Sequence, residues 1–280
     1  MDELFVDVEW LGAAQSDPNV RLVDTRSKPH GVPNNDAPSG AEQYAAGHIP
    51  GAVHLDYADH LADPATPYAM RVAPPEHFAA VAGANGIGDA TTVVAYDDGD
   101  VPYAARLVWM LRYYGHDDAR ILGGGFRGWR AAGGAQTTEV PRYRAQRFTP
   151  RERPELRASR EDVLAVAQGR SDVQLIETQR DKTYALRDRD IARAVRLSGN
   201  DLLDDARGGR VVARGRLDEL VNALRLERNK RTIVTCGSGV SASGAYIALL
   251  AAGFTDLAVY DGSWMEWAHD ELPTAPKTPR

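Results

Sequence analysis

The sequence of 280 residues contains a single cysteine, Cys236. One cysteine excludes an intrachain disulfide, and it argues against a thiolate metal cluster, which needs several cysteines at fixed spacing. Chains without structural disulfides are typical of reducing compartments, so we expect a cytoplasmic protein that binds no metal.

Long apolar runs and an excess of basic residues are also missing. The most apolar stretch, residues 245–254, is far shorter than the ~20 residues that a membrane helix needs. The acidic start, residues 1–5, lacks the layout of a signal peptide. The 33 Lys and Arg are outnumbered by 39 Asp and Glu, giving a net charge of −6 and no basic footprint of a nucleic-acid binder. We therefore expect neither membrane nor nucleic acid as a partner.

The chain consists of two similar halves. Residues 92–129 and 232–267 share one order: an apolar run, a polar loop, an alanine-rich helical pattern, a glycine turn and a tryptophan. Upstream, residues 20–26 parallel residues 173–179. A repeat this long is too large for a solenoid unit, so the sequence predicts two copies of one domain.

Each copy alternates short β-branched runs with helical patterns, which is typical of a parallel sheet covered by helices on both faces. We predict an α/β fold with an N-terminal domain over residues 1–135 and a C-terminal domain over 159–280. The linker between them is predicted at residues 136–158, which contain three prolines among charged residues and show no periodicity.

The loop at Cys236 carries the strongest functional signal. A buried strand is predicted over residues 232–235 and a helix from Ser241, so the cysteine follows the carboxyl end of a parallel strand, where α/β sheets bind their ligands. Glycines allow the backbone to curl so that several N–H groups point at one anion, and the helix adds its positive end. The residues expected to form this anion cradle are Gly237, Gly239, Val240 and Ser241.

This setting predicts a thiol pKa lowered from about 8.5 toward roughly 3.5–7.5, and hence a nucleophilic thiolate. A cysteine-dependent phosphatase would need Arg where Ala242 stands, and a thioredoxin-type pair would need a second cysteine. A papain-like hydrolase would need a histidine base; His48 is a candidate, but the acyl-transfer context is missing. A buried cysteine acting as a small apolar residue is the other alternative, although it needs no glycine loop. Sulfur transfer through a cysteine persulfide fits the remaining requirements.

Three motifs carry a family resemblance: Gly-His-Ile-Pro-Gly-Ala at 47–52, Cys-Gly-Ser-Gly-Val-Ser at 236–241, and Asp-Gly-Ser-Trp-Met-Glu-Trp at 261–267. Together they resemble tandem-domain rhodaneses, and the cysteine loop is most similar to that of 3-mercaptopyruvate sulfurtransferases. Thiosulfate-specific relatives carry Arg-Lys where this chain has Gly237 and Ser238. The resemblance implies two rhodanese-like domains, of which the first is inactive because Asp97 or Asp98 stands in place of the cysteine.

The resemblance also implies a mechanism. The thiolate of Cys236 attacks the sulfur of a small donor, keeps it as a persulfide and passes it to cyanide, a small thiol or thioredoxin, without a cofactor. Ser238 and His48 are implied to move protons between substrate and cysteine. The alternative for His48 is a structural role in its turn.

The second copy departs from the family pattern. Its segment from Glu177 to Asp190 is 11 residues shorter than the matching segment of the first copy, and Gln179 stands where relatives carry an arginine for the donor's anionic group. Arg180 and Arg187 are candidate replacements, because arginine suits carboxylate recognition. Alternatively, residues 187–190 form a solvated face of alternating charge. These departures leave open a thiosulfate or protein-bound donor, and a non-catalytic rhodanese-like binding or regulatory module.

Overall fold

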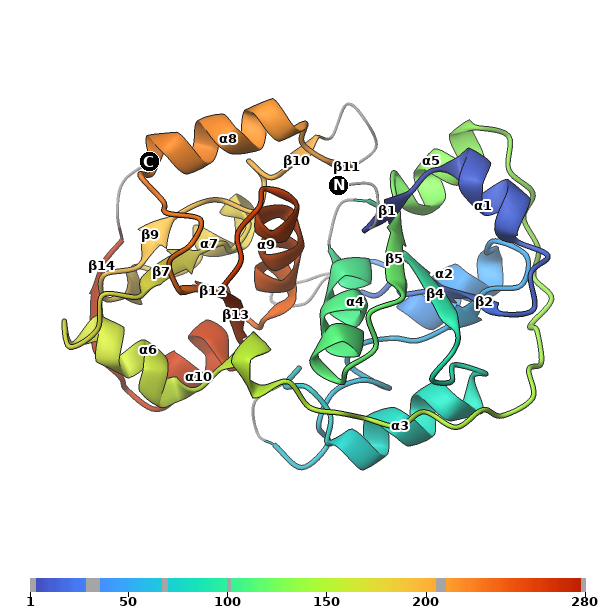
Figure 1. The fold of residues 1–280 in the computed structure, drawn as a ribbon, viewed down its shortest axis with the longest axis horizontal. Coiled ribbons are helices and arrows are strands. Elements are labelled where there is room, and N and C mark those ends of the chain that lie inside the picture. The colour runs from blue at the N-terminus through green and yellow to red at the C-terminus, as the bar shows by residue number, and fades with distance from the viewer. Residues whose placement is uncertain (1–3, 29–35, 67–69, 100–101, 205–209, 278–280) are drawn as a thin grey trace. The chain divides into compact units, whose positions relative to one another are not determined.

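The computed structural model describes residues 4–28, 36–66, 70–99, 102–204 and 210–277 (Figure 1). The chain divides into two compact units. The first contains most of the described chain up to Arg153, and the second contains most of it from Pro154 onward, together with the described part of residues 66–71. This division falls inside the segment 136–158, where the sequence places the linker.

Each unit is built on a five-stranded sheet in which all neighbouring strands are parallel. The spatial order in the first unit is β1 (Phe5–Val6), β5 (Ala119–Leu122), β4 (Thr92–Tyr96), β2 (Val20–Asp24) and β3 (Val53–His54). The order in the second is β6 (Arg157–Ala158), β13 (Leu257–Tyr260), β12 (Thr232–Thr235), β7 (Gln174–Glu177) and β9 (Val195–Arg196). The two orders match strand for strand, which confirms the predicted duplication of one α/β fold.

Helices connect and cover the strands. The first unit contains α1 (Val8–Ala14), α2 (Gly40–Ala46), α3 (Pro75–Ala84), α4 (Tyr103–Tyr113) and α5 (Gly125–Ala131). The second contains α6 (Arg160–Ala167), α7 (Asp181–Tyr184), α8 (Arg214–Ala223), α9 (Val240–Ala251), α10 (Ser263–His269) and the 3-10 turn η1 (Pro154–Leu156). Two strand pairs lie outside the main sheets: β8 (Arg189–Ile191) with β14 (Thr274–Pro276), and β10 (Leu203–Asp204) with β11 (Arg210–Val211). Among the described residues, no helix combines the length and hydrophobicity needed to span a membrane.

The apolar runs form strands because both of their faces are covered. Every residue of β12 and β13 is buried, as expected for inner strands of a parallel sheet with helices on both sides. Helix α9, which follows β12, buries nine of its twelve residues, so it belongs to the interior of its unit rather than to an exposed face. Helix α6 begins with a capping box in which Ser159 and Asp162 satisfy each other's backbone amides.

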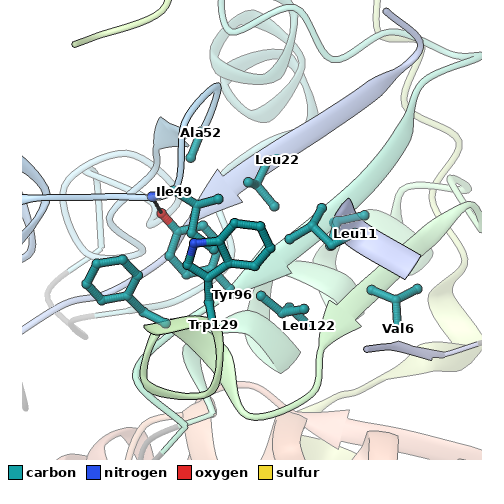
Figure 2. Packing of buried hydrophobic residues seen from close by; sticks show 10 residues of the cluster. Val6, Leu11, Leu22, Ile49, Ala52, Tyr96, Leu122 and Trp129 are labelled. Atoms are coloured by element: carbon teal, nitrogen blue, oxygen red, sulfur yellow. Dashed lines mark hydrogen bonds between the residues drawn. The ribbon is translucent and has the colours of Figure 1, made fainter. Parts of the chain in front are cut away.

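A tryptophan closes the same core in each unit. Figure 2 shows Trp129 of the first unit against Tyr96 and Leu22, and its indole N–H donates to the carbonyl of Ala135 at 2.8 Å. In the second unit Trp267 is fully buried, and its indole N–H donates to the carbonyl of Pro273 at 2.9 Å. The matching bonds, each six residues along the chain, show that the repeat extends to individual side-chain contacts.

Replacing Trp267 by alanine is expected to lower the free energy of unfolding of the second unit by about 3–5 kcal/mol, because it leaves a large cavity in the core. Urea denaturation followed by circular dichroism measures the loss. As a control, the 61 % exposed Leu186 replaced by alanine should change the midpoint little. A midpoint for the Trp267 variant as high as the control's would contradict this account of the core.

Candidate active site

Cys236 lies directly after β12, in the loop that leads to α9. Its side chain is only 2 % exposed. The amide of Gly239, a residue in the left-handed region at φ 85°, donates to the sulfur at 3.1 Å. The amides of Ser238 and Ala242 also act on the thiol and lower its pKa. This arrangement favours a negative charge there.

The residues that form the anion cradle differ in part from the predicted ones. Gly237 supplies the turn, and its carbonyl accepts from the amide of Met265 at 3.0 Å. Val240 and Ser241 form the first turn of α9. The donor missed by the sequence analysis is Ala242, because the pattern does not reveal which amide of a first helical turn faces back toward the loop.

Equivalent hydrogen bonds identify the residue that replaces the cysteine in the first unit. The amide of Phe126 donates to the carbonyl of Asp97 at 2.7 Å, as the amide of Trp264 donates to that of Cys236 at 3.0 Å. The residues before them match too, because the carbonyls of Tyr96 and Thr235 each accept from a threonine hydroxyl. Of the two candidates, Asp97 therefore stands in the position of Cys236.

The carboxylate of Asp97 accepts from the amides of Gly99 at 2.7 Å and Ala104 at 2.9 Å. The loop of the first unit thus binds an anion that belongs to the chain itself. Because each loop leads from an equivalent strand to the helix that follows it, this carboxylate supports the interpretation of the Cys236 loop as an anion cradle.

Ser263 anchors the start of the cysteine loop. It is fully buried, and its hydroxyl accepts from the amide of Cys236 at 3.2 Å and donates to the carbonyl of Tyr260 at 2.8 Å. Its φ of 51° lies in the left-handed region, which is costly for a residue with a side chain. The matching residue of the first unit is Gly125, with φ 56°. Ser263 could not be predicted as a site residue, because one serine within a packing motif carries no signal of its own.

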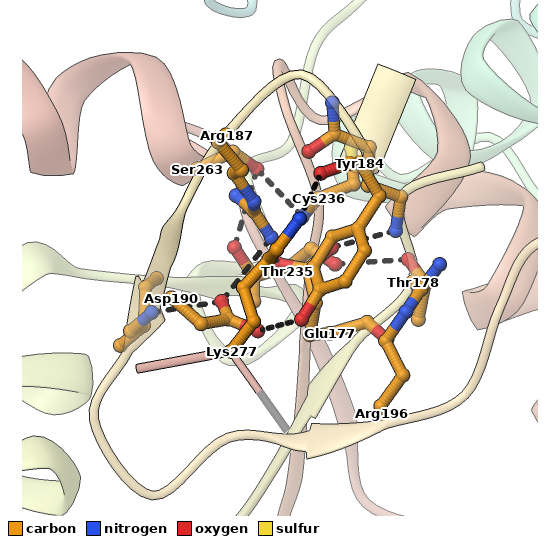
Figure 3. Close-up of polar contacts among 12 residues, drawn as sticks. Glu177, Thr178, Tyr184, Arg187, Asp190, Arg196, Thr235, Cys236, Ser263 and Lys277 are labelled. Carbon is orange, nitrogen blue, oxygen red and sulfur yellow. Dashed lines mark hydrogen bonds and ion pairs between the residues drawn. The ribbon is translucent and has the colours of Figure 1, made fainter. Parts of the chain in front are cut away.

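A cluster of buried charges lies behind the loop (Figure 3). Glu177, fully buried at the end of β7, pairs with Arg187 at 2.5 Å. The same guanidinium nitrogen of Arg187 lies 3.1 Å from Asp190, whose other oxygen accepts from the hydroxyl of Tyr184 at 2.8 Å. Burial raises the pKa of Glu177 to about 7, and Arg187 opposes that rise. Arg187 and Asp190 are therefore buried partners, whereas the intervening residues 188 and 189 are exposed as a solvated face would be.

The pKa of Cys236 is raised above that of an ordinary thiol, which corrects the expectation of a lowered value. Burial is the largest cause, and the negative charge of Glu177 adds to it. The amides of the loop lower the pKa, as predicted, but they do not outweigh the loss of solvent. The sequence revealed the helix end and the glycines, and it did not reveal how deeply the sulfur is buried.

Gln179 and Arg180 border the same loop. The side-chain nitrogen of Gln179 lies 3.2 Å from the place where a Cβ on Gly237 would stand. A Cβ on Gly199 would stand 3.3 Å from Cγ of Arg180 and 3.8 Å from Cβ of Ser241. In the described part of the second unit, Glu177 Oε2 has only its ion pair with Arg187, and the other buried side-chain atoms without a hydrogen-bond partner are Gln179 Oε1, Arg180 Nη1, Arg187 Nε and Arg187 Nη1. Their concentration in one segment marks it as the polar wall of the candidate site.

His48 lies in the first unit and is fully buried. Its Nδ1 is 2.9 Å from the carbonyl of Tyr44 and its Nε2 is 3.0 Å from that of Glu139, while its ring stacks on Tyr44 with centroids 3.7 Å apart. Both ring nitrogens are thus engaged with the backbone of their own unit. This geometry describes the structural role that the sequence analysis left open beside the catalytic one.

Ser263→Ala is expected to lower the free energy of unfolding by about 1–3 kcal/mol, because the buried amide of Cys236 loses its acceptor. Ser263→Gly loses the same acceptor but relieves the left-handed strain, so it should be more stable than the alanine variant by roughly 1 kcal/mol. Urea denaturation of the three proteins measures both differences. An alanine variant as stable as the parent would show that the hydroxyl does not anchor the loop.

The rate of alkylation of Cys236 by iodoacetamide should rise with pH to a midpoint above the ~8.5 of an ordinary thiol. Glu177→Gln should move this midpoint to lower pH, because it removes a negative charge that opposes the thiolate. Glu271→Gln, an exposed change in the same unit, is the matched control and should leave the midpoint in place. A midpoint that moves upward in the Glu177 variant would contradict the electrostatic account.

Comparisons with known proteins agree with this geometry. The model of the rhodanese-like domain matches residues 7–132 and again residues 161–270. The 3-mercaptopyruvate sulfurtransferase of Escherichia coli is 29% identical over 97% of this chain and 98% of its own, and the bovine thiosulfate sulfurtransferase is 29% identical over 96% and 93%. The crystal structure of SseA from E. coli, a 3-mercaptopyruvate sulfotransferase, superposes with a TM-score of 0.82 at 28% identity, over 93% of this chain and 98% of that one. The chain belongs to the family of rhodanese-like domains, as a sulfurtransferase with two tandem copies.

Proposed function

We propose that the protein moves a sulfur atom from 3-mercaptopyruvate, or a related small donor, through a persulfide on Cys236 to a thiol or cyanide. The observation that carries this proposal is the hydrogen bond from the amide of Gly239 to the sulfur of Cys236, at a strand end where the amides of Ser238 and Ala242 also favour negative charge. The similarity to the 3-mercaptopyruvate sulfurtransferase of E. coli over nearly the whole chain supports the choice of donor.

The chemistry needs one nucleophile and one anion cradle. The thiolate of Cys236 attacks the donor's sulfur, the bond between that sulfur and carbon breaks, and the leaving carbon takes a proton to give pyruvate. An acceptor thiolate or cyanide then attacks the outer sulfur of the persulfide, which returns Cys236 as a thiolate. The amides of Ser238, Gly239 and Ala242 stabilise negative charge on the sulfur in both steps.

We assign recognition of the sulfur donor to the polar wall of the site. Arg187 Nε and Nη1 and Arg180 Nη1 are buried and have no hydrogen-bond partner, so an anionic oxygen of the donor would satisfy them. Ser238 is partly exposed beside the sulfur and is our candidate for the proton carrier. The catalytic part predicted for His48 remains a prediction.

A thiol on a small molecule or on thioredoxin is the proposed acceptor. The outer sulfur of a persulfide is open to any thiolate that reaches it, so the chemistry does not require a particular carrier. A location in the cytoplasm, where such thiols stay reduced, fits this chemistry. No cofactor takes part in the proposed reaction.

Thiosulfate is the second candidate donor. Gln179 is neutral where the first unit carries Arg26, which weakens the case for a carboxylate donor held by two cations. The similarity to bovine thiosulfate sulfurtransferase points the same way. A non-catalytic module is favoured less, because the amides around Cys236, the most demanding geometry of the site, are intact.

Intact mass after brief incubation with each donor tests the proposal. 3-Mercaptopyruvate should add one sulfur atom to the parent protein, cyanide should remove it, and Cys236→Ser should gain nothing. Thr255→Ser, a small change at an exposed residue of the same unit, is the matched control and should still load. Faster loading by thiosulfate would favour the second donor. No gain with either donor would contradict the use of a small donor.

A further inference from the structure

The first unit pairs the acid at the end of its strand with an arginine two residues later. Asp24 ends β2, and the guanidinium of Arg26 binds its carboxylate through Nε at 3.0 Å and Nη2 at 2.6 Å. The guanidinium also lies over the ring of Phe126, 4.1 Å from its centroid. Phe126 is the residue whose amide holds the carbonyl of Asp97. One guanidinium thus links the strand end to the helix that supports the loop.

The second unit has lost this arginine from its sequence position. Glu177 ends β7 where Asp24 ends β2, and two residues later stands Gln179, whose side chain lies over Gly237 instead of folding back. The guanidinium of Arg187 occupies the equivalent place. It pairs with Glu177 at 2.5 Å and lies over Trp264, 4.6 Å from the ring centroid.

We propose that Arg187 is the positioning residue of the Cys236 loop, and that it replaces in space the arginine that the first unit carries at Arg26. Both guanidiniums neutralise the acid at a strand end, and both cover the aromatic residue whose amide binds the loop. The replacement comes from eight residues further along the chain than Gln179. A comparison of sequence positions therefore does not find it.

The shortened segment explains how Arg187 reaches this place. After β7 the chain makes a single helical turn, α7, so residue 187 returns toward the strand end within ten residues. Tyr184 then supports the guanidinium in two ways. Its ring lies 4.7 Å from the guanidinium carbon, and its hydroxyl holds Asp190, the second acid on Arg187. Figure 3 shows these groups gathered around Cys236 and Ser263.

The position of the guanidinium bears directly on the cysteine. It opposes the charge of Glu177, which raises the pKa of the Cys236 thiol. It also fixes Trp264, whose amide binds the carbonyl of Cys236. Because Arg187 takes this place, Gln179 is free to line the loop with a neutral carboxamide.

Returning the arginine to its first-unit position tests the proposal. Arg187→Gln should lower Tm by roughly 5–10 °C, because Glu177 loses its buried cation. It should also move the midpoint of Cys236 alkylation to higher pH, since the cluster then carries one positive charge fewer beside the thiol. The double variant with Gln179→Arg and Arg187→Gln should recover at least half of both changes.

Arg26→Gln is the matched control, since it removes the same kind of pair from the first unit. It should lower Tm similarly and leave the alkylation profile of Cys236 unchanged. If Arg187→Gln does not fold, folding of the double variant supports the proposal and its failure to fold overturns it. A double variant no better than Arg187→Gln in Tm and alkylation also overturns it. Neither readout uses a sulfur donor, so these results are independent of the proposed sulfur transfer.

Discussion

One buried ion pair organises the site. Glu177 ends β7 without exposed surface, and an isolated carboxylate in such a place would cost several kcal/mol. The guanidinium of Arg187 pairs with this carboxylate at 2.5 Å. It also lies over the ring of Trp264, whose backbone amide binds the carbonyl of Cys236. The strand end, the start of α10 and the nucleophile therefore depend on one guanidinium. Losing Glu177 would leave the guanidinium buried without its main partner, and losing Arg187 would raise the pKa of Glu177 further.

The equivalent loops of the two units hold different groups. In the first, the carboxylate of Asp97 fills the cradle permanently and accepts from Gly99 and Ala104. In the second, the cradle surrounds the sulfur of Cys236, which can gain and lose a second sulfur in the proposed reaction. A carboxylate cannot carry sulfur in this way, so of the two loops only that of Cys236 is suited to the proposed reaction.

Much of the fold and the position of the nucleophile could be predicted from the order of the residues. The remaining features of the site depend on contacts between residues that are far apart in the sequence. The duplication, the α/β class and the position of Cys236 follow from runs and glycines that are local in the sequence. The role of Ser263 and the choice of Asp97 over Asp98 depend on single hydrogen bonds across the fold. The predicted direction of the shift in the Cys236 pKa was wrong, because the sequence reveals the local amides but not the burial of the sulfur.

A raised pKa at Cys236 is compatible with sulfur transfer from a mercaptopyruvate-type donor. That reaction releases no proton overall, because the carbon that loses sulfur must take one up. A thiol that keeps its proton at rest holds it close to where that carbon would leave, and burial also protects the sulfur from oxidation. With thiosulfate the leaving sulfite has no carbon to protonate, so the resting proton gives no such advantage. In the proposed reaction the buried thiol is therefore better matched to a carbon-bound donor than to thiosulfate.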